Sequence, residues 1–382
     1  MAEPRTVDTV LMRGGTSKAA VFLVGDLPAD PAERDRLLLS WYGSPDPYSR
    51  QLDGIGGGTS STSKAAVIGP SDDPRADVDY LFLQVGIDRA EVDTRGNCGN
   101  ISAAVGPFAV DAGLVPATGR DTRVRIRNLN TDSIIVAHVP TRDGRFDPVG
   151  DLAIPGVPGT GSAIRLDFED PAGAVTGALL PSGEVTDVLD VDGRRIRVSI
   201  VDAANPVVFV AATDLGLSGG DAAEELERVA PLVAAIRAAG AVRAGMIADV
   251  EAATTTPAVP RVAIVAAPSD YRTRAGETIG ADRVDVVASM FSMGRPHAAY
   301  PFTGAIATAV AARLEGSVVH EVATSGTPFR IGHPAGVQTM DAHVTYDEDG
   351  WRVHRVTSYR TARRLMTGRL EIPEPPSHEG EL

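Results

Sequence analysis

The stretches NCGNISAAV, residues 97–105, and FTGAIATAV, residues 302–310, decide how this chain is organised. Aligned with each other, they pair Cys98 with Thr303 at an offset of 205 residues. The same offset pairs the Arg-Ile dipeptide at 125 with that at 330, and the Ala-His-Val tripeptide at 137 with that at 342. Because one spacing recurs in three separate segments, we infer an internal duplication and not a chance match between small-residue stretches.

Length and composition agree with two similar halves. The chain has 382 residues, 43% hydrophobic and 23% charged, and this length favours two domains. The turn-rich segment LLPSGEV (179–185) predicts the boundary. We therefore expect a first half over 1–184 and a second over 185–367, with a tail over about 368–382 that packs back on the first. The 40 glycines and 27 prolines, beside few aromatic residues, indicate a turn-rich α/β or β-rich fold, and each half is expected to be a strand-rich layer around a helix.

Local patterns place the elements within these halves. Asp30, followed by Pro31 and Glu33, predicts the start of a helix that ends near Gly43. An amphipathic pattern predicts a helix over 221–240, and further helices should begin just after Asn100 and just after Thr303. Short β-branched runs predict strands at 21–24, 79–87, 124–128, 133–139, 196–201, 207–212 and 261–267.

Charge and cysteine content exclude several classes of function. The formal net charge of −14 argues against a nucleic acid or an anionic membrane as a partner. The single cysteine, Cys98, excludes an internal disulfide framework and a CxxC metal site. The opening residues carry no signal-peptide pattern and no run approaches 18 apolar residues, so we expect a cytoplasmic protein. An anionic ligand would need a locally positive site in so acidic a chain.

NCGN, at the start of an apolar helix, has the composition of an anion site. Free backbone N–H groups and the positive end of the helix dipole would surround Cys98, an environment that binds carboxylates and favours the thiolate. The alternative is a buried structural cysteine, but Asn97, Gly99 and Asn100 are not core-like neighbours. With Thr303 at the second helix start, we expect two anion-binding starts that together grip a dianion, with one thiol between them.

The hexapeptide TSKAAV occurs twice, and its two copies hold Lys18 and Lys64, the only lysines beside 34 arginines. Both follow glycine-rich loops, which allow a ligand to approach the backbone. A lysine amine can serve as a base near neutral pH, whereas arginine cannot release its proton. The alternative is a pair of surface lysines in flexible loops, but the general replacement of lysine by arginine in this chain counts against it.

The remaining candidates are weaker. His297 lies just upstream of the second helix start, which makes a carboxylate contact plausible, whereas His138 and His343 occupy equivalent strand positions and are expected to be structural. The carboxylates show no spacing that marks an acid–base pair. GGGTSSTSK lacks the Gly-Lys junction of a phosphate-binding loop, so nucleotide binding is not expected.

Taken together, these motifs resemble those of the methylaconitate isomerase and oxalomesaconate tautomerase family, whose members share the diaminopimelate epimerase fold. The resemblance extends from about Val10 to about His343. Two segments depart from the pattern: GSPDPYSRQLDG (43–54) is longer than expected, and Ala19 replaces a more usual glycine after TSK. The motifs that carry the resemblance are MRGGTSK (12–18), GSPD (43–46), RQLDGIGGG (50–58), STSK (61–64), DVDYLF (77–82), NCGN (97–100), VGPFA (105–109), ANPVVFV (204–210) and TGA (303–305).

The resemblance implies an α+β fold of two pseudo-symmetric domains, each a barrel-like, mostly antiparallel sheet around a central helix, with the active site between them. It implies a 1,3-allylic proton shift on an unsaturated di- or tricarboxylate without metal or organic cofactor. Lys64 would carry the proton, Cys98 would lie beside the substrate as acid or contact, and Lys18 would be a cationic neighbour. The implied substrate-binding residues are Arg13, Gly15, Thr16, Ser17, Lys18, Ser63, Asn97, Gly99, Asn100, Ser292, Met293, His297, Thr303 and Gly304.

Two alternatives stay open on the sequence. One is a racemase or epimerase of the same fold that acts at a saturated α-carbon, although Thr303 in place of a second thiol argues against it. The other is a non-catalytic polycarboxylate-binding accessory protein. The sequence names neither the substrate nor the oligomeric state, and a homodimer is one assembly that it allows.

Overall fold

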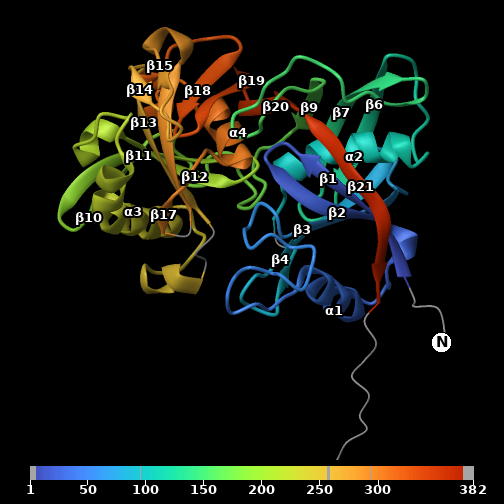
Figure 1. Cartoon of the computed structure of the whole chain (residues 1–382). Coiled ribbons are helices and arrows are strands. Elements are labelled where there is room, and N and C mark those ends of the chain that lie inside the picture. Colours follow the sequence, from blue (N-terminus) through green and yellow to red (C-terminus); the bar gives the residue numbers. More distant parts are fainter. Residues whose placement is uncertain (1–5, 95, 256–258, 293, 373–382) are drawn as a thin grey trace, which may run out of the picture. The chain divides into compact units, whose positions relative to one another are not determined.

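A computed structural model describes residues 6–94, 96–255, 259–292 and 294–372 of the chain. The chain divides into two compact units (Figure 1). Unit 1 runs to Arg165 and resumes at Arg360, and unit 2 runs from Leu166 to Tyr359. The chain passes from unit 1 to unit 2 within strand β9 (Ile164–Glu169) and returns at the end of strand β20 (Gly350–Arg360).

This division differs from the boundary expected at 184/185 and from the expected return near 368. The segment 179–185 is a surface turn of unit 2, in which the Gly183 N–H donates to the Leu180 carbonyl at 2.9 Å. The return begins at Arg360 because strand β21 (Ala362–Glu371) pairs antiparallel along the whole of β1 (Thr6–Gly14). A pairing between the two ends of the chain leaves no local signal in the sequence.

Unit 1 is a sheet with one helix on each face. The strands follow one another in the order β21, β1, β2, β3, β4, β6 and β7, and only the β2–β3 and β4–β6 pairs among these are parallel. Helix α1 packs on one face, and helix α2, buried at every position from Ile101 to Val110, packs on the other. The bounds are β2 (Ser17–Leu23), η1 (Val24–Asp26), α1 (Pro31–Tyr42), β3 (Lys64–Pro70), β4 (Val78–Val85), β5 (Val92–Asp93), α2 (Gly99–Asp111), β6 (Asp121–Asn128), β7 (Ser133–Arg142) and β8 (Arg145–Phe146).

Unit 2 repeats this plan. Its strands run in the order β10, β11, β12, β13, β16, β18, β19 and β20, with parallel pairs at β12–β13 and β16–β18. Helix α4 is buried along its whole length, and α2 in unit 1 is buried from Ile101 to Val110. The bounds are β10 (Asp187–Val191), β11 (Arg194–Asp202), β12 (Pro206–Ala211), η2 (Ala212–Leu215), α3 (Ala223–Arg243), η3 (Glu251–Thr255), β13 (Arg261–Ala266), β14 (Tyr271–Arg272), β15 (Thr278–Ile279), η4 (Ala281–Arg283), β16 (Val286–Ser292), β17 (Arg295–Pro296), α4 (Phe302–Ala311), α5 (Val318–Val322), β18 (Phe329–His333) and β19 (Gly336–Asp347).

The local predictions agree with these elements. Each predicted strand overlaps an observed one, and the Asp30 carboxylate accepts the Glu33 N–H at 2.8 Å, which caps α1 as expected. Gly43 ends α1 in the left-handed conformation. Helices α2 and α4 begin at Gly99 and Phe302, two residues before the predicted starts.

An ion pair repeated in both units confirms the duplication at atomic level. In unit 1 the Asp77 N–H donates to the Arg125 carbonyl, and the Arg125 guanidinium forms an ion pair with the Asp77 carboxylate at 2.7 Å. In unit 2 Asp285 and Arg330 form the same backbone hydrogen bond and the same ion pair, with an ion-pair distance of 2.9 Å. Each ion pair joins two parallel strands. Asp77 precedes β4 and binds Arg125 of β6, and Asp285 precedes β16 and binds Arg330 of β18. The Arg125–Arg330 correspondence has the offset of 205 residues that the sequence predicted.

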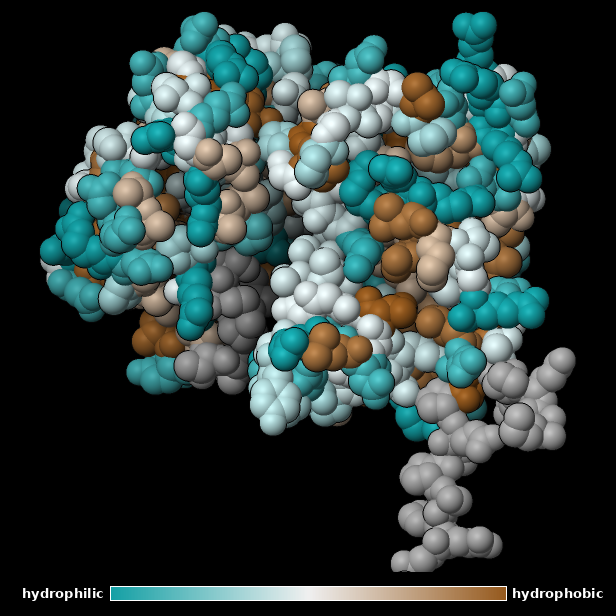
Figure 2. Space-filling view, in the orientation of Figure 1, coloured by the Kyte–Doolittle hydropathy of each residue, from teal (hydrophilic) through white to brown (hydrophobic). Residues whose placement is uncertain are grey.

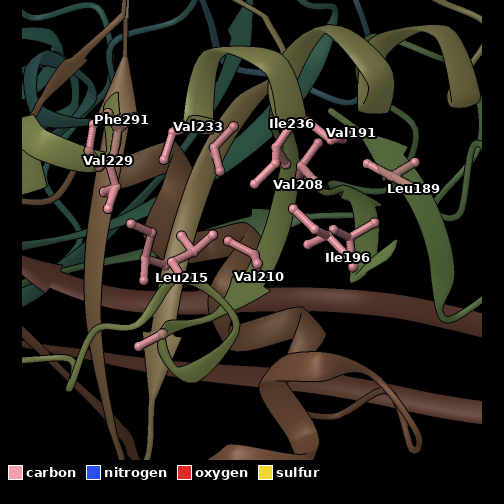
Figure 3. Packing of buried hydrophobic residues seen from close by; sticks show 14 of the residues in the cluster. Leu189, Val191, Ile196, Val208, Val210, Leu215, Val229, Val233, Ile236 and Phe291 are labelled. Atoms are coloured by element: carbon pink, nitrogen blue, oxygen red, sulfur yellow. The ribbon is translucent and has the colours of Figure 1, made fainter. Parts of the chain in front are cut away.

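The outer face of the unit 2 sheet is covered by α3. In Figure 3, Val229, Val233 and Ile236 of the helix point toward side chains of the strands beneath, among them Val208 and Ile196. Ile236 is fully buried in this cluster. The helix is therefore held by apolar packing along one face.

On the face in view, the surface of both units carries hydrophobic and hydrophilic residues side by side. Figure 2 shows hydrophobic residues in small separate patches among hydrophilic ones on the face in view. Within the described ranges, no helix combines the length and the apolar character needed to cross a membrane.

The first turn of α2 is fixed by the β1–β2 turn. A Cβ atom added at Gly14 would lie 2.5 Å from the Asn100 carbonyl oxygen, and one at Gly15 would collide with the Asn100 side chain. Gly15 has φ +50°, which favours glycine in any case. The backbone of MRGGTSK therefore lies directly against the start of the helix that Cys98 precedes.

We predict that Gly14→Ala destabilises the protein by about 1–3 kcal/mol, because the new methyl group has no space beside Asn100. Chemical unfolding measures the effect. Gly25→Ala is the matched control, because a Cβ atom there meets nothing within 4 Å. Equal stability of the two variants would contradict the described packing.

Ile236→Ala should cost about 2–5 kcal/mol of unfolding free energy, since it opens a cavity in the cluster under α3. Val188→Ala, at a position that is 52% exposed in the same unit, should change stability much less. Thermal unfolding of both variants checks the prediction, and a similar midpoint for the two would refute it.

Candidate functional site

Lys64 is the first residue of β3 and is buried, with 8% of its surface exposed. Its Nζ donates to Gln84 Oε1 at 2.6 Å and lies 4.9 Å from the centroid of the Phe82 ring. The Lys64 carbonyl accepts a hydrogen bond from the Tyr42 hydroxyl. The amine is therefore held between an amide oxygen and the face of an aromatic ring, both of which stabilise an ammonium ion.

The face of the sheet that carries Lys64 follows from strand alternation. Ala65 and Val67 belong to the apolar cluster under α1, so Lys64 and Ala66 point to the opposite face, where α2 lies. Gln84 is the register partner of Lys64 on β4 and points to the same face. Tyr80, on the same strand at even spacing, does so as well.

A chain of hydrogen bonds fixes the orientation of Gln84. Its Nε2 donates to the Ser63 carbonyl at 2.8 Å, which directs Oε1 toward Lys64 because a carbonyl can only accept. The Ser63 hydroxyl contacts Gln51 Oε1 at 2.5 Å, and the Gly58 N–H donates to the same oxygen at 2.9 Å. The glycine-rich loop predicted as a ligand-approach segment is thus tied to the Lys64 site through Gln51.

Cys98 directly precedes α2 and is half-buried. Its carbonyl accepts hydrogen bonds from the Ser102 N–H and hydroxyl at 3.0 and 3.1 Å. Burial raises the pKa of Tyr80 well above 10, and the charge of a Cys98 thiolate acts in the same direction. Tyr80 therefore keeps its proton and can only stabilise, not deprotonate, a group beside it.

Asn100 and the turn residues before β2 lie together. The Thr16 N–H donates to Asn100 Oδ1 at 3.4 Å, and the Gly15 N–H donates to the Thr361 carbonyl at 3.0 Å. The Arg13 guanidinium binds the carbonyls of Gly15 and Thr361 at 2.9 and 2.8 Å. Arg13 thus holds the turn in place, a role that accounts for its position in the motif.

The side chains of Lys18 and Lys64 point to opposite faces of the sheet. In the parallel β2–β3 pair the partner of Lys64 is Ala19, so Lys18 points with Ala20 to the α1 face. Ser17, buried and in phase with Ala19, points to the α2 face with Lys64. The expectation that Lys18 is the cationic neighbour of Lys64 is not supported by this register.

In unit 2, Thr303 is buried in the first turn of α4, and its Oγ1 accepts a hydrogen bond from the Arg261 guanidinium at 2.7 Å. Gly304 lies against Met290, where an added Cβ atom would come within 2.6 Å of the sulfur. Of the other predicted residues, Ser292 ends β16, and Met293 lies outside the described residues.

His297 is exposed and has a defined tautomer. Its Nδ1 accepts the Ala299 N–H at 3.1 Å, so a neutral ring carries its proton on Nε2. Although the residue is exposed to solvent, protein atoms that surround the ring lower its pKa below the usual value by desolvation, and the positive charge of Arg261 adds to this effect. The ring also lines a cavity of ≈ 270 Å³ bounded by the start of α3 and by His333.

Sequence reasoning missed Gln84, Tyr80 and Arg261. Gln84 and Tyr80 lie on a strand that was predicted, but only the register with β3 shows which residues share the face of Lys64. Arg261 is one arginine among 34 and becomes distinctive only through its contact with Thr303. Within the described residues, no group of three or more His, Cys, Asp or Glu side chains is placed to hold a metal ion.

Comparison with known proteins gives relatives over the full length. The 3-methylitaconate isomerase of Eubacterium barkeri is 45% identical over 381 residues, which cover 97% of this chain and 98% of that protein. The 4-oxalomesaconate tautomerase of Pseudomonas putida is 42% identical over 369 residues, 95% of each chain.

Solved structures agree with the fold. A methylitaconate-delta-isomerase crystal structure superposes with a TM-score of 0.88 at 42% identity and covers 97% of this chain and 96% of that one. A hydroxyproline epimerase from Agrobacterium vitis matches with a TM-score of 0.55 at 15% identity over 97% and 94% of the two chains, which shows the fold alone. The expected epimerase-like α+β fold is confirmed.

The family model described as PrpF protein matches residues 5–373. With relatives of about 40% identity over the whole length, the chain belongs to the PrpF family of isomerases.

Proposed function

We propose that this isomerase moves a proton along the three-carbon allylic unit of an unsaturated di- or tricarboxylate, with Lys64 as the proton carrier. The observation that carries the proposal is the buried Lys64 amine, held by Gln84 and Phe82 on the α2 face of unit 1. The relatives named for methylitaconate and oxalomesaconate chemistry support the substrate class.

The proton shift has two steps. The neutral Lys64 amine takes a proton from the carbon next to the double bond, and the C–H electron pair enters the conjugated system as a dienolate. The ammonium ion so formed is stabilised by Gln84 Oε1 and by the Phe82 ring. A proton is then delivered to the far carbon of the allylic unit, by the Lys64 ammonium ion or by the Cys98 thiol, whose thiolate the ammonium ion then reprotonates. The double bond moves by one position.

The charge of the substrate and of the dienolate requires preorganised donors. We assign this role to the backbone N–H groups at the start of α2, next to Asn97–Asn100, with Ser17 on the same face. One donor of this kind can contribute about 3–4 kcal/mol to the transition state. The protonated Tyr80 near Cys98 would stabilise negative charge on the thiol.

Lys64→Arg should lower kcat by roughly 10²- to 10⁴-fold, because arginine keeps the positive charge but cannot accept a proton. Lys18→Arg is the matched control: its side chain points to the α1 face, so kcat and KM should stay near the wild-type values. Steady-state kinetics on a polycarboxylate that the wild type isomerises would make the comparison. Near-normal turnover by Lys64→Arg would disprove the role of Lys64.

Gln84→Met should reduce kcat by about 10- to 100-fold, since it removes the acceptor that stabilises the Lys64 ammonium ion. Gln338→Met, at a buried glutamine of unit 2, is the matched control and should leave kcat near the wild-type value. Unfolding midpoints show whether either variant is merely unstable. An unchanged kcat in a folded Gln84→Met protein would argue against this arrangement.

Proton NMR in D₂O on a set of unsaturated di- and tricarboxylates tests the function itself. An allylic isomerase moves the double bond and introduces deuterium at a new carbon. A racemase of the same fold would label only a saturated α-carbon, and a non-catalytic binding protein would exchange no carbon-bound proton. Either of these last two results would overturn the proposal.

A further inference from the structure

The segment 43–54 is longer than the family pattern leads us to expect, and one carboxylate holds it in shape. The Asp46 carboxylate accepts three backbone N–H groups at 2.8, 2.9 and 2.6 Å, from Tyr48, Arg50 and Gln51 respectively. An aspartate side chain that binds backbone groups of the residues after it fixes a tight turn. The 46–51 loop is therefore a defined structure, and its last residue is Gln51.

Gln51 is buried and has an unusual backbone conformation. Only 1% of its surface is exposed, and its φ of +53° lies in the left-handed region, which few residues other than glycine adopt. Glycine would adopt this conformation without strain. A strained glutamine in place of a glycine indicates that its side chain makes contacts that offset the strain.

The side-chain amide of Gln51 makes these contacts. Its Nε2 donates to Ser44 Oγ at 2.8 Å, and its Oε1 accepts the Gly58 N–H at 2.9 Å and the Ser63 hydroxyl at 2.5 Å. Both lone pairs of the amide oxygen are therefore used. A Cβ atom added at Gly56 would lie 2.3 Å from this oxygen, so the glycine-rich loop leaves space for the Gln51 amide.

Ser63 connects Gln51 to Lys64. It is fully buried and directly precedes Lys64 in the chain. Its carbonyl accepts Gln84 Nε2 at 2.8 Å and the Val85 N–H at 3.0 Å. Gln84 Oε1 in turn accepts the Lys64 amine at 2.6 Å. Ser63 is thus fixed at both polar groups, its hydroxyl by Gln51 and its carbonyl by the strand that carries Gln84.

We propose that Gln51 is a positioning residue for Lys64, so that the 46–51 loop sets the geometry in which the amine exchanges its proton. This inference rests on the proposed function, because it takes Lys64 as the proton carrier. Gln51 acts through Ser63 and Gln84 and needs no contact with the substrate. Without the Gln51 amide oxygen, the buried Ser63 hydroxyl loses its acceptor and must rearrange to find another. The carbonyl that directs Gln84 toward the amine then moves as well.

Steady-state kinetics of a double-mutant cycle tests this role. Gln51→Met should lower kcat about 10-fold and leave KM within about 2-fold of the wild-type value, because a displaced amine slows proton transfer and not substrate binding. Gln51→Met combined with Gln84→Met should lose no more activity than Gln84→Met alone, since the first residue acts through the second. Leu52→Ala, at the next position and 73% exposed, is the matched control and should keep kcat.

NMR of the lysine side chains gives a second measurement that does not depend on activity. The chain has only two lysines, Lys18 and Lys64, so protein labelled with ¹³C-lysine gives two sets of side-chain signals, which the Lys64→Arg variant assigns. The Lys64 signals should move in Gln51→Met. Those of Lys18, which points to the opposite face of the sheet, should stay in place.

Unfolding midpoints show whether each variant is folded. The inference is overturned if folded Gln51→Met keeps the wild-type kcat, if the losses of the two substitutions multiply in the double variant, or if the Lys64 signals do not move. Lys64 signals that move in a protein whose wild type isomerises no polycarboxylate would instead overturn the proposed function, while the coupling of Gln51 to Lys64 stands. The two failures are thereby distinguishable.

Discussion

Burial of a helix on all sides is the constraint on which each unit depends. Helices α2 and α4 are buried along almost their whole length, so each needs a sheet that curves around it. Small residues make this packing close: a Cβ atom added at Gly106 would lie 2.7 Å from a Val139 methyl group. Such a helix can meet a ligand only at its end. The start of each helix is therefore the natural place for Cys98 and Thr303.

The duplicated halves retain their structural interactions and diverge in their chemical ones. The ion pairs Asp77–Arg125 and Asp285–Arg330 are the same in geometry because both units need them to lock two parallel strands together. At the strand starts, by contrast, a lysine stands in one unit and Arg261 in the other. Charge is kept at this position in both halves, whereas the ability to exchange a proton is kept in only one.

Much of the fold could be predicted from the sequence, and only part of the candidate site. The capping residues of α1, the predicted strands and the starts of the buried helices depend on neighbouring residues, so their signals are local. Gln84, which holds the Lys64 amine, was not predicted because its role depends on register. The neighbour relation expected between Lys18 and Lys64 is not supported by the register for the same reason, since a shift of one residue reverses the face of the sheet.

The sequence by itself determined the duplication, the strand-rich halves around a helix and the residue types able to carry a proton, because these follow from composition, periodicity and a constant offset of 205 residues. Only the tertiary structure decided where the units divide, which strand completes the first sheet, and which side chains share a face with Lys64. Pairings such as β1 with β21 join residues from opposite ends of the chain. Their free energy comes from contacts that exist only after folding, so no local pattern records them.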